Sequence, residues 1–173
     1  MQLCLIRHPW VDAQQRCYGQ LELNVQQEGL SQALSQLAPF KQQQLISSPA
    51  QRCQQLAYAL SAHVELWSEL QELDFGDWEG RRWQDIPRTE LDDWAADLWH
   101  YPVGGGETVL AFRSRVLHAV QRAHTLQREQ VVWVTHAGVI RMLLAEYQQI
   151  PSEQRWTVPI DYATPYWLNI TSF

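Results

Sequence analysis

The chain has 173 residues, 46% of them hydrophobic and 18% charged, which is typical of a globular protein with a sizeable core and excludes a disordered one. Its net charge of -6 and isoelectric point near 5.4 provide no basic surface for nucleic acid or anionic lipid. We therefore expect neither nucleic acid nor a membrane among its partners.

The first residues form an apolar run that ends at Arg7 and is too short for a signal peptide or a membrane span, so we expect a cytoplasmic protein. Three cysteines without C-x-x-C spacing (Cys4, Cys17 and Cys53) predict reduced thiols and no structural zinc site. The length fits a single domain over residues 1–173.

Short apolar runs alternate with helical periodicity in the first half of the chain. Strands are predicted over residues 3–6, 45–46 and 64–67, and a helix over residues 29–38. A second helix is expected to begin with Ser48 as N-cap and Pro49 at its first position. Its apolar face repeats at helical spacing and consists of Cys53, Leu56, Ala57 and Leu60.

The second half begins with an irregular, aromatic and acidic stretch over residues 76–106, with short helices expected near Trp83 and over residues 91–98. Within it, residues 81–103 are predicted to form a small lid-like insertion. A helix over 107–127, a buried strand over 131–134, a helix over 138–147 and a strand over 166–170 follow. This alternation predicts an α/β fold, a three-layer α/β/α sandwich around a mainly parallel sheet.

Polar side chains follow three of the predicted strands, at the point where each strand ends. They are Arg7 and His8 after residues 3–6, Ser47 and Ser48 with Arg52 after residues 45–46, and Thr135 and His136 after residues 131–134. Because the carboxyl ends of parallel strands meet at one edge of a sheet, these groups should converge there. Two guanidiniums, two imidazoles and two helix N-termini predict an anion site suited to phosphate.

Six motifs also occur in a fixed order along nearly the whole chain. They are Leu5-Ile6-Arg7-His8-Pro9, Gly19-Gln20-Leu21-Glu22 with Gly29, Ser47-Ser48-Pro49 with Arg52, Glu72-Leu73-Asp74-Phe75-Gly76-Asp77-Trp78-Glu79-Gly80, Gly105-Gly106-Glu107-Thr108, and Thr135-His136-Ala137-Gly138. In their order and composition they resemble the histidine phosphatase superfamily of phosphoglycerate mutase-like enzymes. The resemblance implies the fold of that family and a phosphomonoesterase that needs neither metal nor cofactor.

The resemblance also implies a role for each site residue. His8 would attack phosphorus to form a phosphohistidine that water then hydrolyses. Glu72 would protonate the leaving alkoxide and then activate the water. Glu79 is a weaker candidate for this role and is expected to be a structural partner of its loop. The residues that would bind the phosphoryl group are Arg7, Arg52, His136 and Ala137, with Arg7 and His136 also counted as catalytic.

The sequence departs from the family pattern after the first strand. Pro9 replaces the usual glycine, and the stretch from Arg7 to Gly19 is short. The common phosphate-binding asparagine therefore has no clear counterpart, and Gln14 or Gln15 is the candidate substitute.

Arg7-His8-Pro9, Cys17-Tyr18-Gly19 and the Thr135-His136-Ala137-Gly138 motif are similar to the α-ribazole phosphatase branch, which serves cobalamin biosynthesis. The expected substrate is the small phosphomonoester α-ribazole 5′-phosphate, while the oligomeric state is not predicted. Four other functions stay open: a phosphatase of another small metabolite, a phosphoglycerate mutase, a metal-dependent hydrolase, and an inactive phosphate-binding module.

The predicted insertion leaves two interpretations open. Its rings either stack on a flat base of the substrate or form a small core of their own. The rings concerned are Trp83, Trp94, Trp99 and Tyr101.

Overall fold

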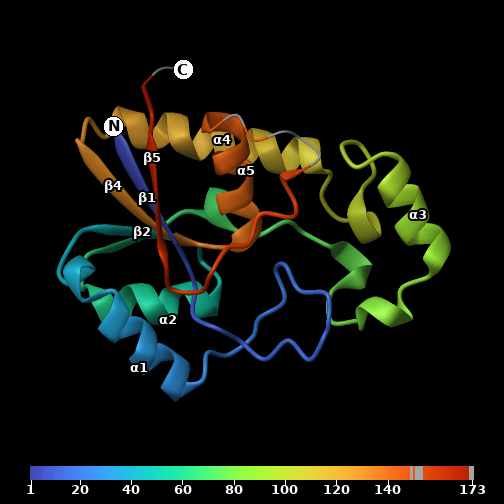
Figure 1. Ribbon diagram of the computed structural model, residues 1–173, viewed down its shortest axis with the longest axis horizontal. Helices are drawn as coiled ribbons and strands as arrows, with labels where there is room; N and C mark the ends of the chain where they lie inside the picture. Colours follow the sequence, from blue (N-terminus) through green and yellow to red (C-terminus); the bar gives the residue numbers. More distant parts are fainter. Residues whose placement is uncertain (149, 151–153, 172–173) are drawn as a thin grey trace.

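A five-stranded sheet forms the middle layer of the computed structural model, which describes residues 1–148, 150 and 154–171 (Figure 1). The strands are β1 (Gln2–Arg7), β2 (Leu45–Ser47), β3 (Val64–Leu66), β4 (Gln130–Thr135) and β5 (Pro165–Asn169). Their spatial order is β3-β2-β4-β1-β5, and all neighbours are parallel except the edge strand β5, which runs antiparallel to β1.

Helices cover both faces of this sheet. Figure 1 shows α1 (Gln27–Gln36) and α2 (Gln51–Leu60) on one face and α4 (Val109–Thr125) and α5 (Ala137–Tyr147) on the other. α3 (Arg88–Ala96) lies beyond one end of the sheet. The short 3-10 helices are η1 (Ala38–Phe40), η2 (Ser68–Leu70), η3 (Gly76–Trp78), η4 (Trp83–Asp85) and η5 (Val103–Gly105). The predicted three-layer sandwich around a mainly parallel sheet is confirmed.

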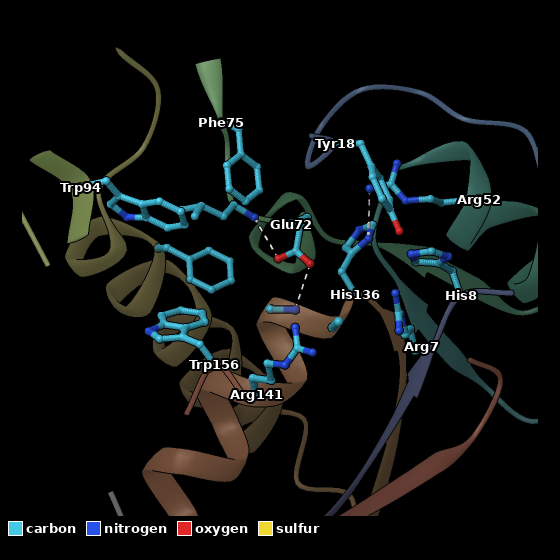
Figure 2. A pocket seen from close by; sticks show the side chains of 14 residues that line it. Arg7, His8, Tyr18, Arg52, Glu72, Phe75, Trp94, His136, Arg141 and Trp156 are labelled. Atoms are coloured by element: carbon cyan, nitrogen blue, oxygen red, sulfur yellow. Dashed lines mark hydrogen bonds between the residues drawn. The ribbon is translucent and has the colours of Figure 1, made fainter. Parts of the chain in front are cut away.

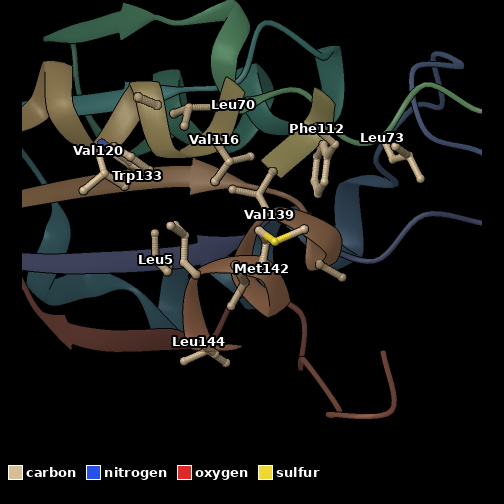
Figure 3. Packing of buried hydrophobic residues seen from close by; sticks show 14 of the residues in the cluster. Leu5, Leu70, Leu73, Phe112, Val116, Val120, Trp133, Val139, Met142 and Leu144 are labelled. Atoms are coloured by element: carbon tan, nitrogen blue, oxygen red, sulfur yellow. The ribbon is translucent and has the colours of Figure 1, made fainter. Parts of the chain in front are cut away.

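The alternation of side chains along β1 divides the core into two clusters. Leu3 and Leu5 join the cluster under α4 and α5, whereas Cys4 and Ile6 join the cluster under α1 and α2. Figure 3 shows Leu5 in the first cluster with Trp133 of β4 and with residues of both helices. Since both faces are buried, the central strands are apolar at nearly every position, which explains why they were visible in the sequence. Among the described residues, no helix combines the length and apolarity that crossing a bilayer requires.

The predicted start of α2 is wrong by two residues. The helix begins at Gln51 with Ala50 as N-cap, and the N–H of Gln51 donates to the Glu22 carboxylate at 2.9 Å. The Ser48 hydroxyl lies 2.8 Å from Nε2 of His136 and 3.3 Å from the backbone N–H of Ala50. The Ser48 side chain therefore contacts His136, the residue that follows β4, in place of capping α2.

The Glu79 carboxylate ties the loop after β1 to the loop before η3. Its Oε2 accepts hydrogen bonds from the backbone N–H groups of Gly19 at 2.9 Å and Leu21 at 3.0 Å. Its Oε1 accepts from Gln20 at 2.9 Å and Phe75 at 3.1 Å. Hydrogen bonds to an ionised acceptor are stronger than neutral ones, so this side chain fixes both loops relative to each other.

Glu79→Gln should destabilise the protein by about 2–4 kcal/mol, because an amide offers one oxygen and turns its NH₂ group toward N–H donors. Urea unfolding measures this free energy. Glu28→Gln on the exposed surface of α1 is the matched control and should change it by less than about 0.5 kcal/mol. A Glu79→Gln protein as stable as that control would contradict the tie between the loops.

Candidate active site

The three parallel strands β1, β2 and β4 bring their carboxyl ends to one edge of the sheet. Arg7 is in register with Thr135, and the backbone N–H of His8 donates to the Thr135 carbonyl at 3.0 Å. The N–H of Ser48 donates to the Val134 carbonyl at 2.9 Å on the other side of β4. The residues that follow these strands therefore lie next to one another.

A cavity of about 280 Å³ opens at this edge (Figure 2). All six residues predicted for the site line it, namely Arg7, His8, Arg52, Glu72, His136 and Ala137. Its other end is apolar and consists of Leu73, Phe75, Trp94, Phe112 and Trp156. The cavity thus joins a cationic end to an aromatic end.

His8 is a buried, neutral imidazole whose Nε2 carries the lone pair. Its Nδ1 lies 2.7 Å from the carbonyl oxygen of Pro9. Because a carbonyl can only accept, Nδ1 must carry the hydrogen. Burial and the Arg52 guanidinium, with a smaller effect of Arg7, hold the pKa of His8 well below its usual range. A neutral imidazole with a lone pair on Nε2 can act as a nucleophile at neutral pH.

His136 lies against His8, with ring centroids 5.3 Å apart. Its Nδ1 is 3.2 Å from Nη2 of Arg52, which can only donate, and its Nε2 is 2.8 Å from the Ser48 hydroxyl. Nδ1 is thus the acceptor and Nε2 the donor of a neutral ring. Burial, followed by the charge of Arg52 and by His8, holds the pKa of His136 well below its usual range.

The two arginines are surrounded by backbone carbonyls instead of carboxylates. Arg52 is fully buried and donates to the carbonyls of Leu21 at 2.8 Å and Gly19, while Arg7 donates to the Ile160 carbonyl at 2.6 Å. Within the described residues neither forms an ion pair, and the Nε of each is buried without a hydrogen-bond partner.

An unpaired buried donor costs about 1–3 kcal/mol, and more when it is charged. An anion with several acceptor oxygens would compensate both guanidiniums at once. The electrostatics of the site therefore favour a phosphate group at this end of the cavity.

The Glu72 carboxylate occupies the N-terminus of α5. Its Oε2 accepts from the backbone N–H of Gly138 at 2.9 Å, and its Oε1 accepts from the N–H of Leu73 at 3.0 Å (Figure 2). A Cβ atom at position 138 would lie 2.1 Å from Oε1, so only glycine leaves room for this carboxylate. The absence of a side chain at one position thus determines where the candidate acid lies.

The structure does not bring Gln14 or Gln15 to the cavity. Both are exposed in a turn with positive φ angles of 50° and 60°. The residue of that loop that lines the cavity is Tyr18. The proposed substitution of either glutamine for the family's asparagine therefore has no geometric support.

Seven lining residues were not predicted for the site: Tyr18, Leu73, Phe75, Phe112, Gly138, Arg141 and Trp156. Arg141 could have been found, since it lies three residues after Gly138 and so on the same face of α5. Its Nε donates to the Val158 carbonyl at 2.8 Å. Trp156 lies in an irregular segment without periodicity, where the sequence carries no comparable signal.

Of the four rings in the predicted insertion, only Trp94 lines the cavity. Trp94 packs edge-on against Trp78 and Phe75, with centroid distances of 5.7 and 6.4 Å. Trp83 contacts Phe75, and Tyr101 contacts Trp78. These rings mainly form an aromatic cluster with Phe75 and Trp78, in the loop that follows Glu72, and Trp94 also reaches the cavity.

Comparison with known proteins bears on the family and the fold of the chain. The family model of the histidine phosphatase superfamily (branch 1) matches residues 3–172. The crystal structure of the α-ribazole phosphatase from Shigella flexneri superposes with a TM-score of 0.85 at 27% identity, over 99% of this chain and 91% of that one.

The curated relatives include proteins named adenosylcobalamin/α-ribazole phosphatase. The one from Escherichia coli K12 is 32% identical over 102 residues, which is 57% of this chain and 50% of the relative, so the match spans half of its length. The one from Salmonella typhimurium is 26% identical over 171 residues, covering 90% of this chain and 84% of the relative.

The two neutral imidazoles should make stability depend on pH. Since their pKa values are lowered from 6.5 by folding, the unfolded chain binds more protons below about pH 6.5, and the free energy of unfolding falls as pH decreases. Each imidazole contributes a slope of up to about 1.4 kcal/mol per pH unit. His8→Asn should remove one such slope in urea unfolding between about pH 6.5 and 5.

The exposed His63→Asn is the matched control for this experiment. The measurement compares slopes, so any uniform destabilisation by His8→Asn does not affect it. A slope equal to that of the wild type would mean that His8 is protonated in the folded protein.

Proposed function

Because the chain belongs to the histidine phosphatase superfamily, we propose that it is a phosphomonoesterase acting through a phosphohistidine on His8. The observation that carries the proposal is the neutral His8 imidazole, with its Nε2 lone pair, in a cavity that it shares with two guanidiniums lacking carboxylate partners. A phosphate group fits both features, as the acceptor for the guanidiniums and the electrophile for the imidazole.

The reaction has two phosphoryl transfers. Nε2 of His8 attacks phosphorus, the bond between phosphorus and the alcohol oxygen breaks, and Glu72 donates its proton to the departing alkoxide. Water then attacks the phosphohistidine, Glu72 takes a proton from it, and inorganic phosphate leaves with His8 restored.

Arg7 and Arg52 bind the equatorial oxygens and stabilise the charge that spreads over them during transfer. His136 and the neighbouring Ala137 complete this binding end. The Nδ1 of His136 accepts from Arg52, so His136 orients that guanidinium toward the phosphoryl group.

For the substrate we propose α-ribazole 5′-phosphate in cobalamin biosynthesis, in the cytoplasm. The names of the relatives support it, and so does the aromatic end of the cavity, where rings of Phe75, Trp94 and Trp156 offer faces and edges to a planar base. In this proposal residues 1–173 act as one domain, and residues 81–103 act as a lid that contributes Trp94.

The substrate is tested by comparing α-ribazole 5′-phosphate with ribose 5-phosphate, which lacks the base. Since stacking of a base on an aromatic side chain is worth about 1–3 kcal/mol, kcat/KM should be about tenfold or more higher for the first. Trp94→Ala should reduce this ratio, and Trp10→Ala, on an exposed indole outside the cavity, should leave it unchanged. Equal rates for both wild-type substrates would reject the base-binding role.

His8→Ala should lower kcat by about 10³-fold or more, because the covalent route is lost. Labelled substrate should leave an acid-labile, base-stable phosphoenzyme on the wild type only. Label on a serine or aspartate would contradict the mechanism.

Measuring the phosphatase activity of the wild type in EDTA tests the alternative of a metal-dependent hydrolase. No group of three His, Cys, Asp or Glu side chains among the described residues is placed to hold a metal ion. Activity should persist after chelation. Loss of activity that Zn²⁺ or Mn²⁺ restores would favour a metal-dependent hydrolase.

Glu72→Gln should slow phosphoryl transfer from an alkyl phosphate far more than from p-nitrophenyl phosphate, whose leaving group departs without a proton. Burst kinetics must isolate this first step, because the second step uses the same carboxylate and slows for both substrates. Glu79→Gln is the control variant: it weakens the loop without changing the candidate acid, so it should slow the first step equally for both substrates. If both leaving groups lose rate equally in the first step, Glu72 is not the acid.

A further inference from the structure

Tyr18 is held between two anchored neighbours in the loop that follows β1. The Cys17 N–H donates to the Arg81 carbonyl, and the Cys17 carbonyl accepts from the Gly80 N–H, both at 2.8 Å. On the other side, the Gly19 N–H donates to Glu79 at 2.9 Å. Backbone bonds on both sides therefore fix the direction in which the Tyr18 side chain leaves the loop.

That direction leads into the cavity. Tyr18 lines it together with Arg7, His8, Arg52 and His136, and Figure 2 shows its hydroxyl directed inward on the side of His8. Its ring lies near Arg52, with 5.4 Å between the guanidinium carbon and the ring centroid. Tyr18 is the lining residue at this end that carries a neutral hydroxyl.

The hydroxyl of Tyr18 interacts with the hydroxyl of Tyr162 and with the Arg7 guanidinium. Burial and Tyr162 raise the pKa of Tyr18 to about 12, so its O–H stays protonated at neutral pH and can donate. Tyr162 in turn packs on Arg7, with 3.6 Å between the guanidinium carbon and the ring centroid, and lies 5.7 Å from His8. Two tyrosines thus surround the arginine beside the nucleophile.

We propose that the Tyr18 hydroxyl is the uncharged hydrogen-bond donor of the phosphate site, bonded to an oxygen of the transferring phosphoryl group and positioned by Tyr162. It takes the role for which the sequence offered Gln14 or Gln15, whose side chains are exposed outside the cavity. The assignment rests on the proposed function, since it assumes a phosphoryl group passing to His8.

A neutral donor has a specific advantage here. Charge develops on the oxygens of the phosphoryl group during transfer, and each preorganised donor stabilises it. Another cation in this place would further disfavour a positive charge on His8, which becomes cationic as it is phosphorylated. A hydroxyl stabilises the oxygens without that effect.

Tyr18→Phe removes the hydroxyl and keeps the ring. With p-nitrophenyl phosphate, kcat should fall by about 10²-fold, the loss typical of one preorganised donor, while KM changes much less. The inhibition constant of vanadate, which mimics the five-coordinate phosphoryl group, should rise in parallel with the loss in kcat. A purely structural role would not link these two quantities.

Gln15→Ala and Tyr58→Phe, the latter on an exposed tyrosine, are the matched controls and should behave as the wild type. Tyr18→Phe with kcat and vanadate affinity within about twofold of these controls overturns the assignment, provided the wild type forms phosphohistidine. A rate loss in Gln15→Ala as large as in Tyr18→Phe would also overturn it. A wild type that forms no phosphohistidine would instead overturn the proposed function, and this inference with it.

Discussion

The site depends on one constraint, the burial of the Arg52 guanidinium without a carboxylate partner. Its positive charge is the largest specific cause, after burial itself, of the low pKa values of His8 and His136. The carbonyls of Gly19 and Leu21 that receive its hydrogen bonds belong to the segment held by Glu79. The neutral histidines, the shape of the loop and the positive charge of the cavity therefore follow from the same buried guanidinium.

Such a charge is expensive to bury, and the rest of the fold makes it tolerable. The apolar clusters on the two faces of the sheet supply stability that offsets the cost of a buried guanidinium whose Nε has no partner. Within the site, the negative groups are kept at a distance, with Glu79 occupied by backbone N–H groups and Glu72 at the start of α5 beside Gly138. An ion pair with either would leave less positive charge for a phosphate ligand.

Much of this arrangement could be predicted from the sequence, because the signals were local. The central strands are apolar on both faces, and the residues after β1, β2 and β4 meet because parallel strands end at one edge. What could not be predicted depends on contacts between distant segments. Ser48 contacts His136 and does not cap α2. The Tyr18 side chain enters the cavity because Glu79, Gly80 and Arg81 hold the backbone of its two neighbours by hydrogen bonds. Residues 154–163, which supply Trp156 and Tyr162, carry no periodicity that would have marked them.

The two ends of the cavity are built by different parts of the chain. The cationic end is anchored to strands and helix starts at the middle of the sheet, whereas the aromatic end is assembled from the loop around Phe75, from α3 and from the segment around Trp156. Substitutions at the aromatic end can therefore accumulate without disturbing the side chains of the cationic end. In evolutionary terms, a lineage with this architecture can exchange one alcohol for another by changing a few rings, while its chemistry is inherited intact.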